Sequence, residues 1–506
     1  MLAVTGNQIL FTTESGRFNK DAANGYFTQG VLLSAGFSVL CGLLVALGCP
    51  VYLDYIAPAP AVRAFADEYF GVYALMSVTD VMLSSLGAFI YVDGGVRRCA
   101  AGAGAFFIFR ILGGYILCRY YGIVGLPLSG LIGNLAFLAV LCGHFLTAGC
   151  SLKIRWAVSW ESLRRALWLS LSPCSDLLFS MLAGLFYAKI ASAKFGTEGL
   201  LVLVVVNSLL FFGKFYNGIS TAVQPLVGVY SGERNPRGVA RVWRLAFWWA
   251  LGLSLPPAVA LFCMPDLVAW FFNINASEYV EPVRQAVRFA ALLMPFTPFI
   301  ILWGEYLPII GHNRLAVFYN FGRSLVLPVA VVYCASFFLG SICMVGGMAG
   351  AAFCLLLFWA GCWAVLGFRR AVLVVDRSRE ERIFMYDIPL AHAEVSRVSE
   401  DVSAKVLEFT GDKPRAYRGA LWVEEVLLAV REHNPGKKLF AEISLDLNDI
   451  RKARLTFRDN GVVFNLTDTD NAVSSFSDYF LGCLLSETPD RVNLTTVGCN
   501  RNSFQF

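Results

Sequence analysis

The chain has 506 residues, of which 57% are hydrophobic and only 15% are charged, and its mean hydropathy is +0.61. This composition excludes an ordinary soluble globular protein. The formal net charge of +5 is small for this length and predicts no nucleic-acid surface. The apolar residues gather in recurring runs long enough to cross a bilayer, so we expect a polytopic membrane protein whose partner is the lipid bilayer.

The 14 cysteines are scattered, and most of them lie inside apolar runs. None belongs to a metal-ligand pattern, so we interpret them as small apolar residues and expect no metal site. No basic region precedes an apolar segment at the beginning of the sequence, so no cleavable signal peptide is expected.

Ten full-length apolar segments follow one another and predict an all-α membrane domain with about ten full transmembrane helices. Most exceed the roughly 20 residues that a spanning helix needs, so we expect tilted helices. The segments cover approximately residues 25–49, 66–91, 99–118, 124–149, 166–193, 199–229, 242–272, 284–310, 315–337 and 345–368.

The basic residues of the turns are distributed unequally between the two sides of the membrane. One side carries 15 of them and the other carries 3, namely Arg63, Arg119 and Lys194. This positive-inside bias places both ends of the ten-segment region in the cytoplasm of a bacterial cell, at its inner or plasma membrane. The 15 are Arg17, Lys20, Arg97, Arg98, Lys153, Arg155, Arg164, Arg165, Arg234, Arg237, Arg241, Arg244, Arg314, Arg369 and Arg370.

Two stretches of 12 residues resemble each other at an offset of 216, Q-I-L-F-T-T-E-S-G-R-F-N from Gln8 and Q-P-L-V-G-V-Y-S-G-E-R-N from Gln224. They are identical at five positions. Such an offset is typical of duplicated halves and predicts two pseudo-symmetric lobes, with residues 25–149 superposing on about 241–365. In this alignment the first lobe is incomplete by about one and a half helices. We expect a misplaced start codon, a truncated gene or a shortened variant.

From Val375 the composition becomes that of a soluble domain. We therefore expect an incomplete N-lobe over 1–149, a C-lobe over 150–370, a linker over 371–391 and a cytoplasmic domain over 392–506. Periodicity in this last part predicts an α+β sandwich with helices on one face of a mixed sheet. The expected helices cover 392–409, 417–433 and 475–486, and the expected strands cover 439–447, 452–458 and one or two segments ending at Phe506.

Ionisable side chains at membrane depth are expensive and usually functional, which makes a short set of residues candidates for cation or substrate binding. Asp176 is a candidate Na⁺ or H⁺ ligand, or alternatively a helix cap or an interhelical hydrogen-bond acceptor. We expect Asp176 and Glu305 to face protein or a cavity and not lipid. We expect Lys214 to pair with Asp176 or with a counterpart of it, or alternatively to extend to an interface. The full candidate set is Asp176, Glu305, Lys214, Asp80 and Asn217, whereas Arg110 and Arg323 are interpreted as structural anchors.

Residues 1–370 resemble the multidrug and toxic compound extrusion (MATE) transporters. The resemblance lies in Gln224–Gly232, in its copy from Gln8 and in Gly122–Pro127. It implies two six-helix lobes and export of a small-molecule substrate, drug-like or otherwise amphipathic, coupled to Na⁺ or H⁺. Two alternatives stay open: a lipid or polysaccharide flippase of the same superfamily, and a membrane-tethered signalling protein.

Residues 392–506 resemble the Bergerat-type ATP-binding domain of histidine kinases, in Val423–His433, Phe457–Val463 and Gly498–Phe504. The resemblance implies nucleotide contacts from Glu425, Asp459 and Gly461. Ala429, however, stands where the family has an Asn ligand of Mg²⁺, and the glycine-rich lid is reduced to Leu481-Gly482. A methyl group provides no oxygen ligand. We therefore expect no ATPase activity, weak or absent ATP binding, and a regulatory domain with a cytoplasmic protein partner.

Overall fold

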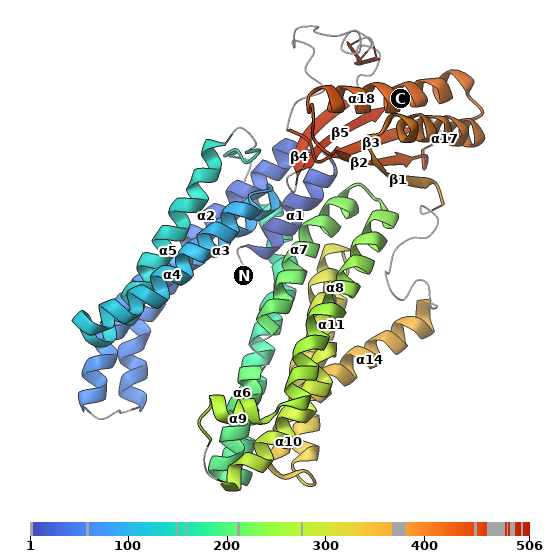
Figure 1. Cartoon of the computed structure of the whole chain (residues 1–506). Helices are drawn as coiled ribbons and strands as arrows, with labels where there is room; N and C mark the ends of the chain where they lie inside the picture. Colours follow the sequence, from blue (N-terminus) through green and yellow to red (C-terminus); the bar gives the residue numbers. More distant parts are fainter. Residues whose placement is uncertain are drawn as a thin grey trace. The chain divides into compact units, whose positions relative to one another are not determined.

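The computed structural model describes residues 4–56, 60–147, 150–156, 159–209, 213–274, 277–366, 381–449, 453–462, 481–482, 484–485, 491–496 and 499–506. These residues divide into two compact units, which we treat separately. One unit holds the chain up to Ile9 and the helices that follow Arg164. The other holds Leu10–Leu163 together with the C-terminal domain (Figure 1).

The first part of the chain is a series of helices that we call the N-lobe: α1 Thr5–Gly16, α2 Lys20–Ile56, α3 Pro60–Val92, α4 Val96–Tyr121 and α5 Gly125–Cys142. The second part, the C-lobe, contains α6 Trp160–Leu209, α7 Gly213–Gly232, α8 Pro236–Cys263, α9 Asp266–Phe271, α10 Ser277–Leu293, α11 Thr297–Ile309, α12 Asn313–Phe321, α13 Leu327–Ala335 and α14 Gly346–Leu366. A π-helical segment, η5 Gly322–Val326, joins α12 to α13.

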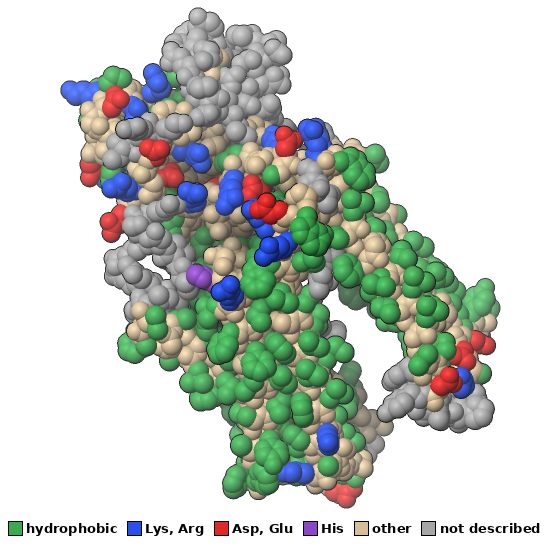
Figure 2. Space-filling view, turned by 180° about the vertical axis from the view of Figure 1, so that it is seen from behind, with side chains coloured by type: hydrophobic (Ala, Val, Ile, Leu, Met, Phe, Trp, Pro, Cys, Tyr) green, Lys and Arg blue, Asp and Glu red, His purple; other side chains and the backbone are tan. Residues whose placement is uncertain are grey.

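Eight stretches of the described chain are long and apolar enough to cross a membrane. Two of them, Val96–Leu146 with 51 residues and Trp160–Leu209 with 50, are much longer than the others, which have 23 to 32 residues. Each of the two contains a glycine with positive φ, Gly122 at 59° and Gly196 at 56°. Only glycine adopts this conformation without strain, so each stretch breaks there into two segments. The ten expected apolar segments correspond to these pieces, and the chain is a multi-pass membrane protein. Figure 2 shows a surface covered largely by hydrophobic side chains, with the charged side chains gathered in smaller groups.

Close backbone approach holds the helical hairpins together. A Cβ atom on Gly102 of α4 would lie 2.1 Å from the Phe137 ring of α5, and one on Gly133 would lie 3.1 Å from Phe106. In the C-lobe, a Cβ atom on Gly350 of α14 would lie 2.5 Å from the backbone of Pro328. Membrane helices gain van der Waals contact by such small residues, because lipid supplies no hydrophobic drive between helices.

The 216-residue offset reappears in the helix boundaries. Helix α1 ends at Gly16 and α7 at Gly232, while α2 begins at Lys20 and α8 at Pro236. The helices that follow also keep their order, so the duplication predicted from the sequence agrees with the element boundaries. Superposition of the two lobes stays a prediction.

The described residues of the C-terminal domain form a five-stranded sheet covered by the helices α17 and α18. Its elements are β1 Ile383–Pro389, α17 His392–Thr410, α18 Lys413–Glu432, β2 Phe440–Asp446, β3 Arg454–Asp459, β4 Arg491–Thr496 and β5 Cys499–Gln505. The strand order is β1-β2-β3-β5-β4, and every neighbouring pair is antiparallel. The expected mixed sheet was therefore wrong, and the expected linker contains β1. Most of the expected helix 475–486 lies outside the described residues.

One face of this sheet packs on α17 and α18 (Figure 1). The Trp422 ring of α18 stacks on Phe504 of β5 at 4.1 Å between centroids, and both side chains are buried. Because successive strand residues point to opposite faces, Arg501 lies on the other face of the sheet from Phe504. That other face carries an ion pair between Arg458 and Glu442.

Candidate functional site

A charged pair joins two helical segments of the C-lobe. The Asp176 carboxylate of α6 accepts from the Arg323 guanidinium of η5 at 2.9 Å, and it also accepts from the Ser324 hydroxyl. The Arg323 side chain is 11% exposed and that of Asp176 is 30% exposed. An isolated carboxylate in the hydrocarbon region costs about 3 kcal/mol, so pairing explains how this one is accommodated.

Neighbouring polar groups hold Arg323 in place. Its Nε donates to the Asn320 side chain at 2.9 Å, and Asn320 in turn donates to the Ser172 carbonyl and hydroxyl at 2.9 and 3.0 Å. A Cβ atom on Gly304 of α11 would lie 2.9 Å from an Arg323 nitrogen, so the missing side chain of this glycine leaves room for the guanidinium. The pair thus lies in a network that ties α6, α11 and α12 together.

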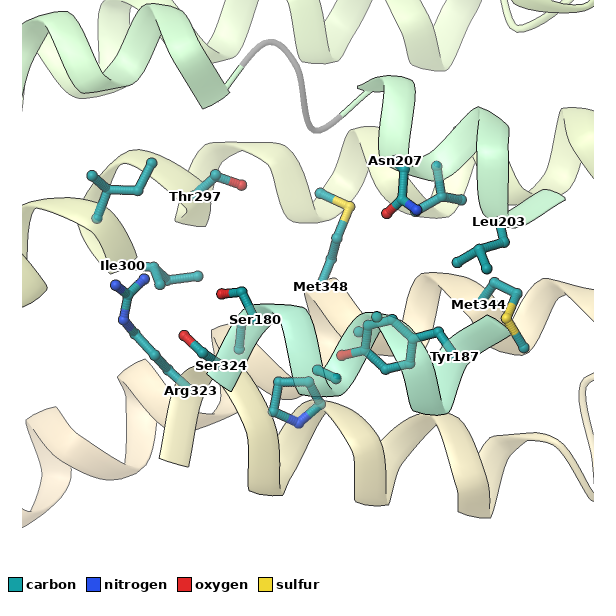
Figure 3. A pocket seen from close by; sticks show the side chains of 17 residues that line it. Ser180, Tyr187, Leu203, Asn207, Thr297, Ile300, Arg323, Ser324, Met344 and Met348 are labelled. Atoms are coloured by element: carbon teal, nitrogen blue, oxygen red, sulfur yellow. The ribbon is translucent and has the colours of Figure 1, made fainter. Parts of the chain in front are cut away.

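A cavity of about 300 Å³ opens beside this network, within the C-lobe. Its walls are mostly apolar, with polar groups from Ser180, Tyr187, Asn207 and Thr297. Among the described residues that line it, Arg323 is the charged one. In the view of Figure 3, Arg323 and Ser324 lie toward one end, and Leu203 and Met344 lie toward the other. An apolar cavity with a few placed polar groups suits an amphipathic ligand of small size.

Glu305 of α11 is partly buried and lies close enough to Arg323 and Asp176 to interact electrostatically with both. Two carboxylates and one guanidinium therefore share this region. Asp176 and Glu305 thus lie near protein charges, while their orientation relative to lipid stays a prediction. Their transport role stays a prediction.

The remaining candidates lie elsewhere. Asp80 of α3, in the N-lobe, accepts from the buried Asn134 side chain of α5 at 2.7 Å. Asn217 of α7 is exposed, and its carbonyl accepts from Thr221 at 2.8 Å. Lys214 belongs to α7, but its side chain lies outside the described part of the structure.

Arg323 is the functional candidate that sequence reasoning missed, because it was interpreted as a structural anchor. Asp176 pairs with Arg323 of η5, across a separation of 147 residues. The expected pairing with Lys214 falls on a side chain outside the described part of the structure. The sequence did contain a signal for this residue, because Arg323 lies inside a predicted apolar segment, where a guanidinium is unusual. Such a charge needs a partner at membrane depth, and the nearest free acidic candidates were Asp176 and Glu305.

The candidate nucleotide residues of the C-terminal domain form a closed local network. One Asp459 carboxylate oxygen accepts from Gly461 N–H at 3.0 Å and the other from the Asn500 side chain at 3.4 Å. Burial raises the pKa of this carboxyl to about 6, although both hydrogen bonds favour its charged form. A Cβ atom on Gly461 would lie 2.6 Å from the Asn434 side-chain nitrogen, and Asn434 also accepts from Val462 N–H at 2.7 Å. Asn434 therefore fills the space beside Gly461.

Helix α18 presents no oxygen ligand at the position that the resemblance assigns to one. Ala429 is fully buried in the core between helices and sheet, while Glu425 is partly buried about one turn earlier on the same helix. A buried methyl group cannot contribute to an oxygen-ligated Mg²⁺ site.

Comparison with known proteins finds similarity to membrane transporters. Residues 173–334, which contain Asp176, Glu305 and Arg323, match the family model MatE. The match covers less than half of the chain. No curated protein matches the sequence.

Several solved structures share the fold. One is an outward-facing multidrug resistance MATE family transporter of the MOP superfamily, 19% identical, with a TM-score of 0.64 over 73% of this chain and 82% of that one. A MOP superfamily transporter from Pyrococcus furiosus, described as having a binding pocket of reverse polarity, gives the same values. A MATE structure in complex with MaD3S is 18% identical, with a TM-score of 0.63 over 73% and 82%. The membrane region therefore has the MATE fold.

Proposed function

We propose that this chain is a secondary transporter of the MATE family that exports drugs or other amphipathic small molecules in exchange for Na⁺ or H⁺ across a bacterial cell membrane. The observation that carries the proposal is the Asp176–Arg323 pair beside an apolar cavity, inside the segment that matches the MatE model. The apolar wall suits the body of such a substrate, and Arg323 with its hydroxyl and amide neighbours suits a polar end.

The pair also supplies a physical route to coupling. The Asp176 carboxylate binds either Arg323 or a cation, since Na⁺ or H⁺ replaces the guanidinium as the compensating positive charge. Cation binding thereby frees Arg323, which lines the cavity. Cation and substrate then favour different arrangements of the same network, and exchange follows from the shift between these populations.

Uptake into proteoliposomes made with the full chain tests this function. Rhodamine 6G and fluorescein serve as cationic and anionic probes, with imposed Na⁺ or H⁺ gradients. We expect gradient-driven uptake of at least one probe by the native protein and at least a tenfold loss in Asp176→Asn. Glu281→Gln is the matched control, because this exposed carboxylate of α10 also pairs with an arginine, Arg284, but does not line the cavity. Gradient-driven uptake that survives Asp176→Asn would place the coupling site elsewhere.

A flippase for lipids or polysaccharides is the alternative on the same fold. It would move fluorescent lipid or lipid-linked sugar between leaflets in the same vesicles, without a gradient-driven flux of either dye. The apolar cavity favours the export of smaller molecules, because 300 Å³ suits a drug-sized body better than a polymer.

For the C-terminal domain we propose a regulatory role that does not use ATP hydrolysis, on a degenerate histidine-kinase-like scaffold with a cytoplasmic protein partner. The support is the buried Ala429 methyl and the Asn434 side chain beside Gly461. Titration of the full chain in detergent with ATP, with and without Mg²⁺, is expected to show weak or no binding and no turnover. Submicromolar, Mg²⁺-dependent binding would contradict this assignment.

A further inference from the structure

Three side chains with metal-binding atoms converge at the end of α3. Asp93 follows the last residue of α3, His144 lies in the short 3₁₀ segment after α5, and Cys150 lies in the loop beyond it. Their ligand atoms all lie within 4.8 Å of one another. Asp93 is 3% exposed and His144 is 6% exposed, so neither is an ordinary surface group. The sequence spacing gave no sign of this cluster, because Asp93 is distant from the other two along the chain.

Folding alone does not account for these residues, since the C-lobe makes the same turn without them. In the N-lobe, Gly94 has φ 92° and Gly95 N–H donates to the Ile90 carbonyl at 2.8 Å. In the C-lobe, Gly311 has φ 89° and His312 N–H donates to the Leu307 carbonyl at 2.9 Å. The residue before the glycine is Asp93 in the first turn and Ile310 in the second. The turn therefore closes equally well with an apolar side chain, and the buried carboxylate needs another explanation.

The surroundings resemble those of an oriented ligand. The Asp93 carboxylate accepts from Ser151 N–H at 3.1 Å and from the Ser151 hydroxyl, and it contacts His144 Nε2 at 2.8 Å. Outer hydrogen bonds of this kind fix the direction in which a carboxylate presents its remaining lone pairs. Gly95 leaves room for the imidazole, because a Cβ atom there would lie 3.1 Å from His144 Nδ1.

We propose that Asp93, His144 and Cys150 form a zinc site that fastens the loop after α5 to the end of α3. Carboxylate oxygen, imidazole nitrogen and thiolate sulfur are all zinc ligands, at about 2.0 to 2.3 Å from the metal. Tetrahedral geometry at those lengths separates ligand atoms by roughly 3.5 Å, so small side-chain rotations suffice. A water or the Ser151 hydroxyl completes four ligands.

Cobalt binding to the full chain tests the site, because a thiolate ligand gives Co²⁺ a charge-transfer absorption that oxygen and nitrogen ligands do not. After treatment with a chelator, we expect about one Co²⁺ per native chain with this absorption, and its displacement by Zn²⁺. The absorption should disappear in Cys150→Ser and persist in Cys142→Ser, a matched control whose exposed thiol lies at the end of α5.

His144→Asn gives an independent variant should Cys150→Ser fold poorly, and it is expected to weaken Co²⁺ binding at least tenfold. Zn²⁺ should raise the Tm of the native protein and of Cys142→Ser, but not that of Cys150→Ser or His144→Asn. Absence of the charge-transfer absorption in the native chain, or its persistence in both site variants, would overturn the proposal and leave the cluster as a hydrogen-bonded turn.

Discussion

The turn after α1 and the turn after α7 are two copies of one structure with different surroundings. Phe18 and Arg234 both have left-handed φ, at 62° and 58°. Asn19 N–H donates to the Glu14 carbonyl and Asn235 N–H to the Tyr230 carbonyl, each at 2.9 Å. Every one of these positions repeats at the offset of 216. The two turns therefore have the same backbone conformation but different side chains.

The divergence gives each copy a different neighbour. In the N-lobe copy, Arg501 of β5 donates to the Ser15 carbonyl at 3.0 Å and to the Gly16 carbonyl at 3.3 Å. Its guanidinium also lies 4.2 Å from the centroid of the Phe18 ring. The C-lobe copy has Arg234 in place of Phe18. Arg234 would repel a second arginine, whereas the aromatic face of Phe18 attracts one. The first turn therefore has the chemistry to receive an arginine, which accounts for its contact with Arg501 of the C-terminal domain.

The largest effect is expected from Arg501→Ala. The guanidinium is buried, caps the negative end of α1 and stacks on an aromatic ring, and charged hydrogen bonds of this kind contribute about 3 kcal/mol together. Loss of that contribution corresponds to roughly 100-fold faster hydrogen exchange of those backbone amides that the contact between β5 and the end of α1 protects from solvent. Hydrogen exchange measured on peptides covering residues 10–20 and 499–506 of the full chain provides the test.

Two variants sharpen that experiment. Arg397→Ala removes an exposed arginine that pairs with Glu394 one turn away, and it should leave exchange near residues 10–20 unchanged. Arg501→Lys keeps the charge but loses the planar fork that reaches two carbonyls, so an intermediate effect is expected. Equal exchange in the native protein and Arg501→Ala would mean that the turn does not depend on this contact.

The repeat, the apolar segments and most of the C-terminal elements could be predicted from the sequence, because each has a local signal. The partner of Asp176 could not, since it depends on how α6 packs against η5. The strand β1 was assigned to a linker because it follows a charged segment, and its pairing with β2 is a long-range contact. Cys150 was interpreted as an isolated apolar residue, because Asp93 and His144 approach it only in the folded chain.

The next largest effect is expected at Gly238. This residue follows the turn after α7, and its equivalent after the α1 turn, at the offset of 216, is Ala22. A Cβ atom on Gly238 would lie 2.1 Å from the Tyr230 ring, whereas the N-lobe has Glu14 in place of that tyrosine and accepts an alanine. Gly238→Ala should therefore destabilise the chain by about 2 kcal/mol through overpacking, despite the better helix propensity of alanine. A lower Tm of the purified protein would show it.

A double-mutant cycle separates the clash from other effects. Tyr230→Ala creates a cavity and is itself destabilising, but it removes the ring that alanine at position 238 would meet. The combined variant should be more stable than the sum of the two single effects predicts. Strict additivity would show that Tyr230 does not select glycine at this position.

The smallest difference is expected at the two asparagines that begin the next helices. Asn235 accepts from Gly238 N–H at 3.0 Å in a buried setting, and Asn19 accepts from Ala22 N–H at 3.2 Å in an exposed one. Loss of such a cap costs about 1 kcal/mol, and more when water cannot replace it. Asn235→Ala should therefore lower the Tm more than Asn19→Ala, and Asn235→Ser should recover most of the loss because serine is also a good cap. If Asn19→Ala were the more damaging change, the N-lobe turn would be held by its own cap and not by Arg501, and the contrast between the two copies would be reversed.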